Sequence, residues 1–347
     1  MRVIWKLDEI VNNLPTKDKE LFDRFYTYYV EEGRLILPEG LKKWAYEKFG
    51  KNCERQRIVR VINNFTFEST LFNELRAKRP IDVKESEDIK RIVEETKGDF
   101  FCNPLEKTPS DPFGRIEGKH CITASNIAKY DYIHAVIIFK NHDPYSFSEE
   151  EVFDYFEVVE RWFNKAHEVY PDAIYPFFMW NCLWKAGASI VHGHAQALIS
   201  KVPYGRWMFY KLVRNDYEKK FESEYLLDLY RVHESLGLGT EKNGIKVLSH
   251  LTPIKEKEIL LIGENFKDLA WCVAKVLQVY YELGVRSFNV AGFIPELGKK
   301  DFVLIRIVDR GNLGVRTVDI GGMELYAGTS VVASDPFKVF EFLASRL

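Results

Sequence analysis

The chain has 347 residues, of which 46% are apolar, so it can bury one large core or the cores of two or three ordinary domains. Its 49 Lys and Arg residues are balanced by 51 Asp and Glu residues, which gives a formal net charge of -2. This balance excludes a protein that holds nucleic acid or an anionic membrane through a global basic field, so any phosphate site must be local.

The first residues do not resemble a targeting segment, because Lys6, Asp8 and Glu9 interrupt their apolar pattern. No run approaches the roughly 18 apolar residues that a membrane helix requires. The cysteines are odd in number and widely spread, which favours a reducing compartment over a disulfide framework. They are Cys53, Cys102, Cys121, Cys182 and Cys272. We therefore expect a cytoplasmic protein without a membrane segment.

The N-terminal region shows helical spacing, broken at Pro15 and Gly33. A strand pattern and then a short helix ending at Gly98 follow it. We expect residues 1–70 to form a mainly helical N-terminal extension. The predicted helices cover residues 7–14, 18–32, 37–49 and 86–98, and the predicted strand covers residues 56–69.

The rest of the chain repeats one order of elements: strand, strand, helix, strand, strand. The first set covers residues 119–128, 132–139, 148–170, 177–182 and 188–200, and its helix begins with a Ser-x-x-Glu capping pattern. The second set covers residues 243–250, 257–263, 265–284, 286–294 and 300–311. The spacing of roughly 110 to 125 residues is typical of two fused α+β modules. We predict a first module over residues 71–215 that carries the active site and a degenerate second module over residues 216–347.

The run GASIVHGHAQALIS, residues 187–200, places polar side chains at every second position of an apolar stretch. In a strand, His192, His194 and Gln196 would share one face. Two imidazoles and an amide are costly to bury unpaired, so the run predicts a functional site. The histidines could be zinc ligands, or one could attack phosphorus. Gly187 and Ser189 favour phosphorus chemistry, because small residues let backbone N–H groups approach a phosphate. The matching VLIRIVDR run of the second set is expected to be an ordinary apolar strand.

This motif, preceded by Asn181, resembles the transferase branch of the histidine-triad (HIT) superfamily, which comprises galactose-1-phosphate uridylyltransferases and Ap4A phosphorylases. The likeness covers about residues 70–347. It implies a duplicated HIT-like module, a homodimer, and a catalytic set of His194 as the nucleophile with Gln196 and His192. The substrate-binding residues that it implies are Arg76, Arg79, Asn181, Gly187, Ser189, Gln196, Arg316 and Glu324.

The resemblance also implies a zinc site, for which Cys102, His142 and His192 match the family's ligands. The family's Cys-x-x-Cys pair is incomplete, because Leu105 stands where the second thiol is expected. Glu106, His120 or Cys121 could complete the set, and a metal-free site remains an alternative. The family's proline between the two histidines is Gly193 here.

Gln196 cannot protonate a leaving group, which favours transfer between phosphates over hydrolysis. The expected function is a nucleotidyltransferase that works by double displacement through a nucleotidyl-His194. It would move a nucleoside monophosphate between a nucleotide sugar and a hexose 1-phosphate. The alternatives are an Ap4A phosphorylase, a zinc-dependent hydrolase and a catalytically inactive nucleotide-binding protein. The expected partners are a nucleotide sugar or dinucleoside polyphosphate and a phosphate acceptor, with no nucleic acid and no membrane.

Overall fold

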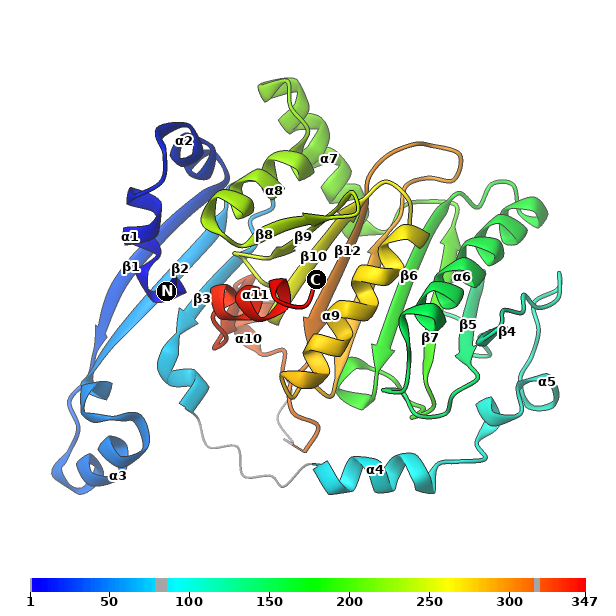
Figure 1. The fold of residues 1–347 in the computed structure, drawn as a ribbon, viewed down its shortest axis with the longest axis horizontal. Helices are drawn as coiled ribbons and strands as arrows, with labels where there is room; N and C mark the ends of the chain where they lie inside the picture. Colours follow the sequence, from blue (N-terminus) through cyan, green and yellow to red (C-terminus); the bar gives the residue numbers. More distant parts are fainter. Residues whose placement is uncertain (1, 79–85, 315–318) are drawn as a thin grey trace.

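The computed structural model describes residues 2–78, 86–314 and 319–347. Its described part is an α+β fold built on two sheets, one of nine strands and one of four (Figure 1). The large sheet has the strand order β4-β5-β7-β6-β11-β12-β10-β9-β8, and its neighbouring strands pair antiparallel. The predicted α+β class with antiparallel strands and packed helices is confirmed.

The first half of the large sheet contains β4 (Cys121–Ser125), β5 (His134–Phe139), β6 (Tyr175–Cys182) and β7 (His194–Ser200), and α6 (Glu149–Val169) covers one face. The helix begins after Ser148, whose hydroxyl accepts the Glu151 N–H while the Glu151 carboxylate accepts the Ser148 N–H, as the capping pattern predicts. Alternate β7 residues between Ala195 and Ile199 pack under α6. This turns His194 to the opposite face of the sheet.

The second half of the large sheet has the same kinds of elements. Its strands are β8 (Gly239–Lys242), β9 (Ile245–Ser249), β10 (Glu256–Gly263), β11 (Phe288–Phe293) and β12 (Val303–Asp309), and α9 (Ala270–Glu282) lies beside α6 on the same face (Figure 1).

The strand order is symmetric about the central β6–β11 pair, from which it runs outward as β6-β7-β5-β4 and as β11-β12-β10-β9. Met179 faces Ala291 at the centre. Gln196 pairs with Met179 on one side, and Arg306 pairs with Ala291 on the other. This correspondence places Arg306 where the first half has Gln196, and the division into two related modules stays a prediction.

The expectation of an ordinary apolar strand in the second half is wrong at Arg306, which is only 3% exposed. Its guanidinium donates to both carboxylate oxygens of Glu258, at 2.6 and 2.9 Å, and to Glu68 at 2.6 Å. A guanidinium can be buried when carboxylates neutralise it and accept its N–H groups. The second half therefore carries an ion-pair cluster at this position.

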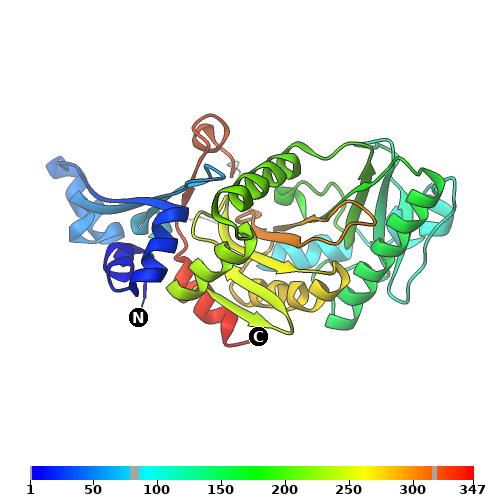
Figure 2. The ribbon, with the colours of Figure 1, turned by 90° about the horizontal axis from the view of Figure 1, so that it is seen from above.

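The small sheet has the order β1-β2-β3-β13 and projects to one side of the large sheet (Figure 2). The helix predicted over residues 18–32 is wrong in its second half, because α2 ends at Phe25 and β1 begins at Tyr26. The sequence YTYYVEEGR is rich in aromatic residues that favour strands. The N-terminal region thus combines helices with the strands of this sheet, and β13 from the C-terminal region pairs parallel with β3. The elements are α1 (Leu7–Asn12), α2 (Thr16–Phe25), β1 (Tyr26–Arg34), α3 (Glu39–Phe49), β2 (Arg55–Asn63), β3 (Ser69–Asn73) and β13 (Thr329–Val332).

The faces of the large sheet opposite α6 and α9 differ in how far helices cover them. In the second half, a hydrophobic core that includes α7 and α8 covers the face opposite α9. In the first half the corresponding face holds a small apolar cluster on β4 and β5 and the cavity described below. The remaining helices are α4 (Ser86–Glu95), α5 (Pro104–Lys107), α7 (Gly205–Phe221), α8 (Tyr225–Leu236), α10 (Gly322–Leu325) and α11 (Pro336–Ala344).

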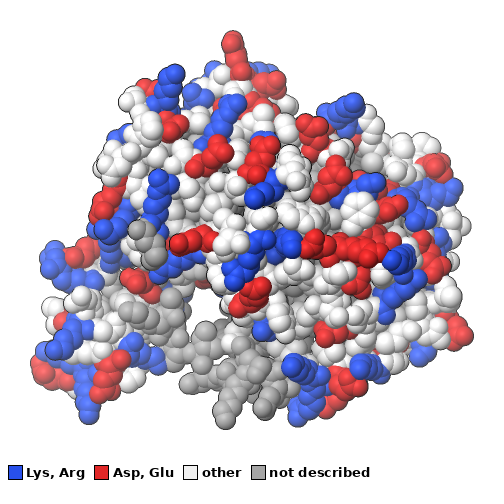
Figure 3. All heavy atoms as spheres, viewed as in Figure 1, with Lys and Arg blue, Asp and Glu red and all other residues white. Residues whose placement is uncertain are grey.

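Among the described residues, no helix combines the length and the apolar character needed to span a bilayer. On the face shown in Figure 3, acidic and basic side chains are interspersed over the surface.

Candidate active site

His194 is the first residue of β7, and its ring is turned into a cavity of about 400 Å³. Its Nδ1 atom lies 2.7 Å from the carbonyl oxygen of His192. A carbonyl can only accept, so Nδ1 must carry the proton. Burial lowers the pKa of His194, which keeps the ring neutral and leaves a lone pair on Nε2. Because Nε2 makes no hydrogen bond with the described residues, it is available as a nucleophile.

Three predicted residues line this cavity together with His194: Gly187, Ser189 and Gln196. Gly187 has a φ of +94°, in the left-handed region that favours glycine, and it ends the short 3-10 turn Trp184–Ala186. Further lining comes from residues 124–128 at the end of β4, from Lys107 and from the aromatic residues Phe100, Phe101 and Tyr130. The cavity thus combines a basic residue and hydroxyl-bearing residues with aromatic residues, a mixture typical of small-molecule sites.

Gln196 is only 5% exposed, and its amide oxygen lies 2.8 Å from Nε2 of His134. The sequence pattern did not point to His134. The available signal was a polar residue at the start of the apolar run HAVIIF in β5.

His192 does not share the β7 stripe, because the predicted strand over residues 188–200 begins only at His194. A Cβ atom on Gly193 would lie 2.8 Å from the Phe139 ring, so the chain passes too close there for any side chain. The Gly193 N–H also donates to the His142 carbonyl, a bond that the family's proline could not form. His192 is thereby directed to a second site beside the cavity.

Four potential metal ligands meet at this second site: Asp99, Cys102, His142 and His192. Nδ1 of His192 lies 3.1 Å from Nδ1 of His142, 3.3 Å from the Asp99 carboxylate and 3.6 Å from the Cys102 sulfur. The sulfur is 3.4 Å from Nδ1 of His142. Zinc with bonds of about 2.0–2.3 Å would separate tetrahedral ligand atoms by about 3.3–3.8 Å. The four distances above lie close to this range, and all four ligand atoms lie within 4.8 Å of one another.

The hydrogen bonds around the four residues agree with a cation. Nε2 of His192 lies 2.7 Å from the Phe139 carbonyl, and Nε2 of His142 lies 2.9 Å from the Val93 carbonyl. Both Nε2 atoms must therefore carry protons, and both Nδ1 lone pairs point inward. The second oxygen of Asp99 is buried without a hydrogen-bond partner. Inward lone pairs beside a thiol and a carboxylate fit a bound zinc ion.

The fourth member of this cluster corrects the ligand prediction. It is Asp99, three residues before Cys102, so the pair reads Asp-x-x-Cys and the position of Leu105 is irrelevant. None of the three alternatives belongs to the cluster: Cys121 contacts Asp154, His120 lies near Glu150 and Glu151, and Glu106 bonds to Asn103. His194 is not a member either, which argues against a site in which both histidines of the motif hold zinc.

The other predicted substrate-binding residues that the structure describes do not line the His194 cavity. Asn181 accepts a hydrogen bond of 2.6 Å from Asn289, which also donates to the carbonyl of Ala186 just before Gly187. Arg76 lines a separate cavity with Lys255 and Arg310. Arg79 and Arg316 lie outside the described residues.

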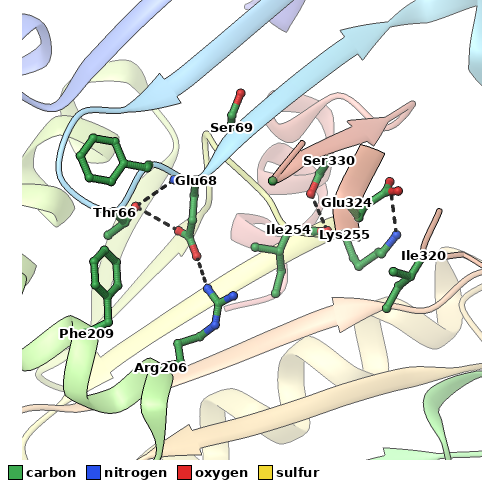
Figure 4. Close-up of a pocket in the computed structure, with 12 residues that line it drawn as sticks. Thr66, Glu68, Ser69, Arg206, Phe209, Ile254, Lys255, Ile320, Glu324 and Ser330 are labelled. Atoms are coloured by element: carbon green, nitrogen blue, oxygen red, sulfur yellow. Dashed lines mark hydrogen bonds and ion pairs between the residues drawn. The ribbon is translucent and has the colours of Figure 1, made fainter. Parts of the chain in front are cut away.

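Glu324 faces an open cavity of about 590 Å³ between the small sheet, α7 and the C-terminal region (Figure 4). Glu68 and Arg206 form an ion pair of 3.0 Å in its wall, and Glu324 lies 3.7 Å from Lys255. Within one chain, the predicted substrate-binding residue Glu324 and the predicted nucleophile His194 therefore line different cavities.

The fold is shared with several solved structures. An ADP-glucose phosphorylase from Arabidopsis thaliana with bound ADP-glucose has a TM-score of 0.60 and 15% identity, over 79% of this chain and 94% of that chain. A GalT-like protein from Arabidopsis thaliana has a TM-score of 0.59 and 14% identity, over 73% and 93%. A uridylyltransferase has a TM-score of 0.57 and 15% identity, over 83% and 98%. These likenesses confirm the expected α+β fold, with a large antiparallel sheet and packed helices, and agree with the resemblance that the motif suggested. No protein-family model and no curated protein matches the sequence.

Proposed function

We propose that this protein transfers a nucleoside monophosphate between two phosphates through a covalent bond to Nε2 of His194. The observation that carries the proposal is the bond from Nδ1 of His194 to the His192 carbonyl, which leaves the Nε2 lone pair directed into the cavity. The shared fold adds support, because two of its members are described as a uridylyltransferase and an ADP-glucose phosphorylase.

The reaction is a double displacement. Nε2 of His194 attacks the α-phosphorus, an N–P bond forms, and the P–O bond to the departing phosphate breaks with its electron pair on that phosphate. An oxygen of the acceptor phosphate then attacks the same phosphorus and releases His194. The proton stays on Nδ1 throughout and donates to the His192 carbonyl, whose oxygen stabilises the positive charge on the nucleotidylated ring.

Gln196 can donate to a phosphoryl oxygen but cannot protonate the leaving group. The departing group must therefore be a good one, such as a sugar 1-phosphate or a nucleoside diphosphate. Ser189 and the backbone near Gly187 line the same cavity and offer further donors to the phosphates. Bound zinc would supply rigidity to Asp99, Cys102, His142 and His192, and so fix the carbonyl that orients His194.

The preferred substrates are a nucleotide sugar and a hexose 1-phosphate, because the GGMELYAGT segment resembles the family's sugar-phosphate segment. The second candidate is an Ap4A phosphorylase, which would use the same nucleophile with another acceptor. A homodimer belongs to this proposal, since Glu324 of the same chain lines a different cavity and a second subunit could bring its own copy to His194. Light scattering at micromolar concentration should give twice the chain mass, and a monomer would contradict this part.

The experiment that tests the function is a set of three incubations. The protein is mixed with UDP-glucose and galactose 1-phosphate, with ADP-glucose and inorganic phosphate, and with Ap4A and inorganic phosphate. We expect transfer in one of the first two mixtures. Product in the Ap4A mixture alone would select the second candidate, and hydrolysis without transfer would contradict the proposal.

A further inference from the structure

Gln196 carries one amide oxygen and one NH2 group, and only the NH2 group can donate to a phosphoryl oxygen. The direction of the amide therefore decides whether Gln196 can play the part that the proposed function gives it. Its oxygen lies 2.8 Å from Nε2 of His134, a side chain with no exposed surface. We infer that His134 is a positioning residue, which holds the Gln196 amide so that its NH2 group serves the transferred phosphoryl group. This inference rests on the proposed function.

The protonation of His134 follows from a backbone contact. The N–H of Tyr130 lies 3.0 Å from Nδ1 of His134. A backbone N–H can only donate, so Nδ1 accepts and the proton of the neutral ring sits on Nε2. Burial lowers the pKa of His134, which agrees with a neutral ring. Nε2–H must then donate, and an amide turned the other way would set NH2 against it.

The neighbouring amide of Asn126 does not compete for this proton. Its nitrogen lies 3.3 Å from Nε2 of His134, but an amide nitrogen is not an acceptor. Its oxygen already accepts the N–H of Ala128 at 2.9 Å. The Gln196 oxygen is thus the acceptor for His134, at the shorter of the two distances.

His134 also joins Gln196 to one wall of the cavity. Asn126 and Tyr130 line that cavity, and the Tyr130 ring covers the His134 ring with 4.8 Å between centroids. His134 itself is not among the described residues that line the cavity, so it acts through Gln196. A donor that is fixed in advance lowers the barrier as charge develops on the phosphoryl oxygens. Loss of His134 should therefore reduce kcat more than it changes KM.

The first variant is His134→Phe, which keeps a ring but removes the donor. We expect kcat to fall by about 10- to 100-fold, the usual cost of losing a residue that orients a functional group, with KM changed less than about 3-fold. In His134→Gln an amide NH2 can replace Nε2–H, and kcat should return to within about 5-fold of the wild type.

The decisive measurement is a double-mutant cycle with Gln196→Ala. If His134 acts through Gln196, His134→Phe should change kcat less than about 2-fold in the Gln196→Ala background. The matched control is His233→Phe in α8, which packs on the other half of the sheet. His233 is equally buried and makes two hydrogen bonds, so this change should lower Tm but leave kcat per folded molecule unchanged.

The outcomes separate the two proposals. An active wild type whose kcat is insensitive to His134→Phe would overturn the positioning role alone. An equal loss of kcat from His134→Phe in the wild type and in Gln196→Ala would also overturn it, because His134 would then not act through the Gln196 amide. A wild type that neither transfers nor forms an adduct would overturn the proposed function, and this inference with it.

Discussion

At His194, one hydrogen bond determines which ring nitrogen can react. The His192 carbonyl holds the proton on Nδ1, and the lone pair on Nε2 faces the cavity. His192 is held in turn by the Phe139 carbonyl and directs its Nδ1 into the metal cluster. The two histidines of one motif thus present different nitrogens to different places: Nε2 of His194 to the cavity and Nδ1 of His192 to the cluster of potential metal ligands.

The first prediction concerns the covalent intermediate. In His194→Gly, transfer should fall by at least about 1000-fold, because the nucleophile is lost while the cavity remains. Intact-mass spectrometry of the wild type with substrate should show an acid-labile adduct of one nucleoside monophosphate, and the variant should show none. An adduct that persists in His194→Gly would place the nucleophile on another residue.

The second prediction concerns metal content. We expect about one zinc per chain by elemental analysis, because the cluster offers four ligands of the kind that closed zinc sites use. Asp99→Ala and Cys102→Ser should each reduce that content by more than about half. The matched control is Cys121→Ser, a buried thiol outside the cluster, which should leave zinc content unchanged. Full zinc in both ligand variants, or its loss in the control, would contradict the assignment.

The sequence could predict the residues that the motif holds close together along the chain. His194, Gln196, Gly187 and Ser189 meet in one cavity because they lie within ten residues and β7 has a two-residue period. Asp99 and His134 join the site from other elements, and only the folded sheet brings them there. Their contacts depend on tertiary packing, which a local pattern does not contain.

At the scale of the elements, the sequence predicts long regular helices and strands, but it does not predict a change from helix to strand within one continuous run. The helices at residues 149–169 and 270–282 and the strands around them follow clear periodicities. The change from α2 to β1 within one continuous run depends on pairing between β1 and β2, which stabilises extended backbone where the sequence alone is ambiguous.

The third prediction tests the ion-pair cluster that joins β12 to β10 and to the small sheet. Arg306→Met leaves Glu258, which is 1% exposed, without its cation, so we expect a loss of about 3–5 kcal/mol in urea unfolding. Adding Glu258→Gln should restore part of this loss, since it removes the unpaired charge and keeps an acceptor. Arg206→Met is the control on the exposed side of Glu68 and should cost about 1 kcal/mol or less. Equal losses of unfolding free energy in Arg306→Met and Arg206→Met would show that the buried ion pairs are not the source of the stability.

For the whole molecule, we expect two buried groups in the second half, His233 and Glu258, to determine how the free energy of unfolding changes at acid pH. His233 donates from Nδ1 to the Leu229 carbonyl and accepts the Leu251 N–H at Nε2, so the folded state needs its neutral form. Burial, with His250 nearby, lowers the pKa of His233 to about 3. Burial alone would raise the pKa of Glu258, but Arg306 and His250 lower it to about 2.

The fourth prediction follows from the sign of these shifts. In the unfolded chain a histidine titrates near about 6.5 and a glutamate near about 4.3. Between the unfolded and folded pKa values the unfolded state binds more protons, so stability falls as the pH falls. His233 should lower the free energy of unfolding as the pH falls from about 6.5 towards its folded pKa. Glu258 should lower it only below about pH 4.3. The Glu258 contribution should therefore appear only at the acid end of the titration.

The measurement is the free energy of unfolding in urea at several pH values between 7 and 5, where the Glu258 contribution has not begun. His233→Gln keeps a donor and an acceptor but cannot titrate. Relative to the wild type, its stability should depend less steeply on pH, by up to about 1.4 kcal/mol per pH unit, because one proton fewer is taken up on unfolding. Parallel curves for the two proteins would show that His233 takes up its proton in the folded chain as readily as in the unfolded chain, which would contradict the prediction. A steeper wild-type curve would show instead that its burial as a neutral ring makes the folded chain acid-sensitive.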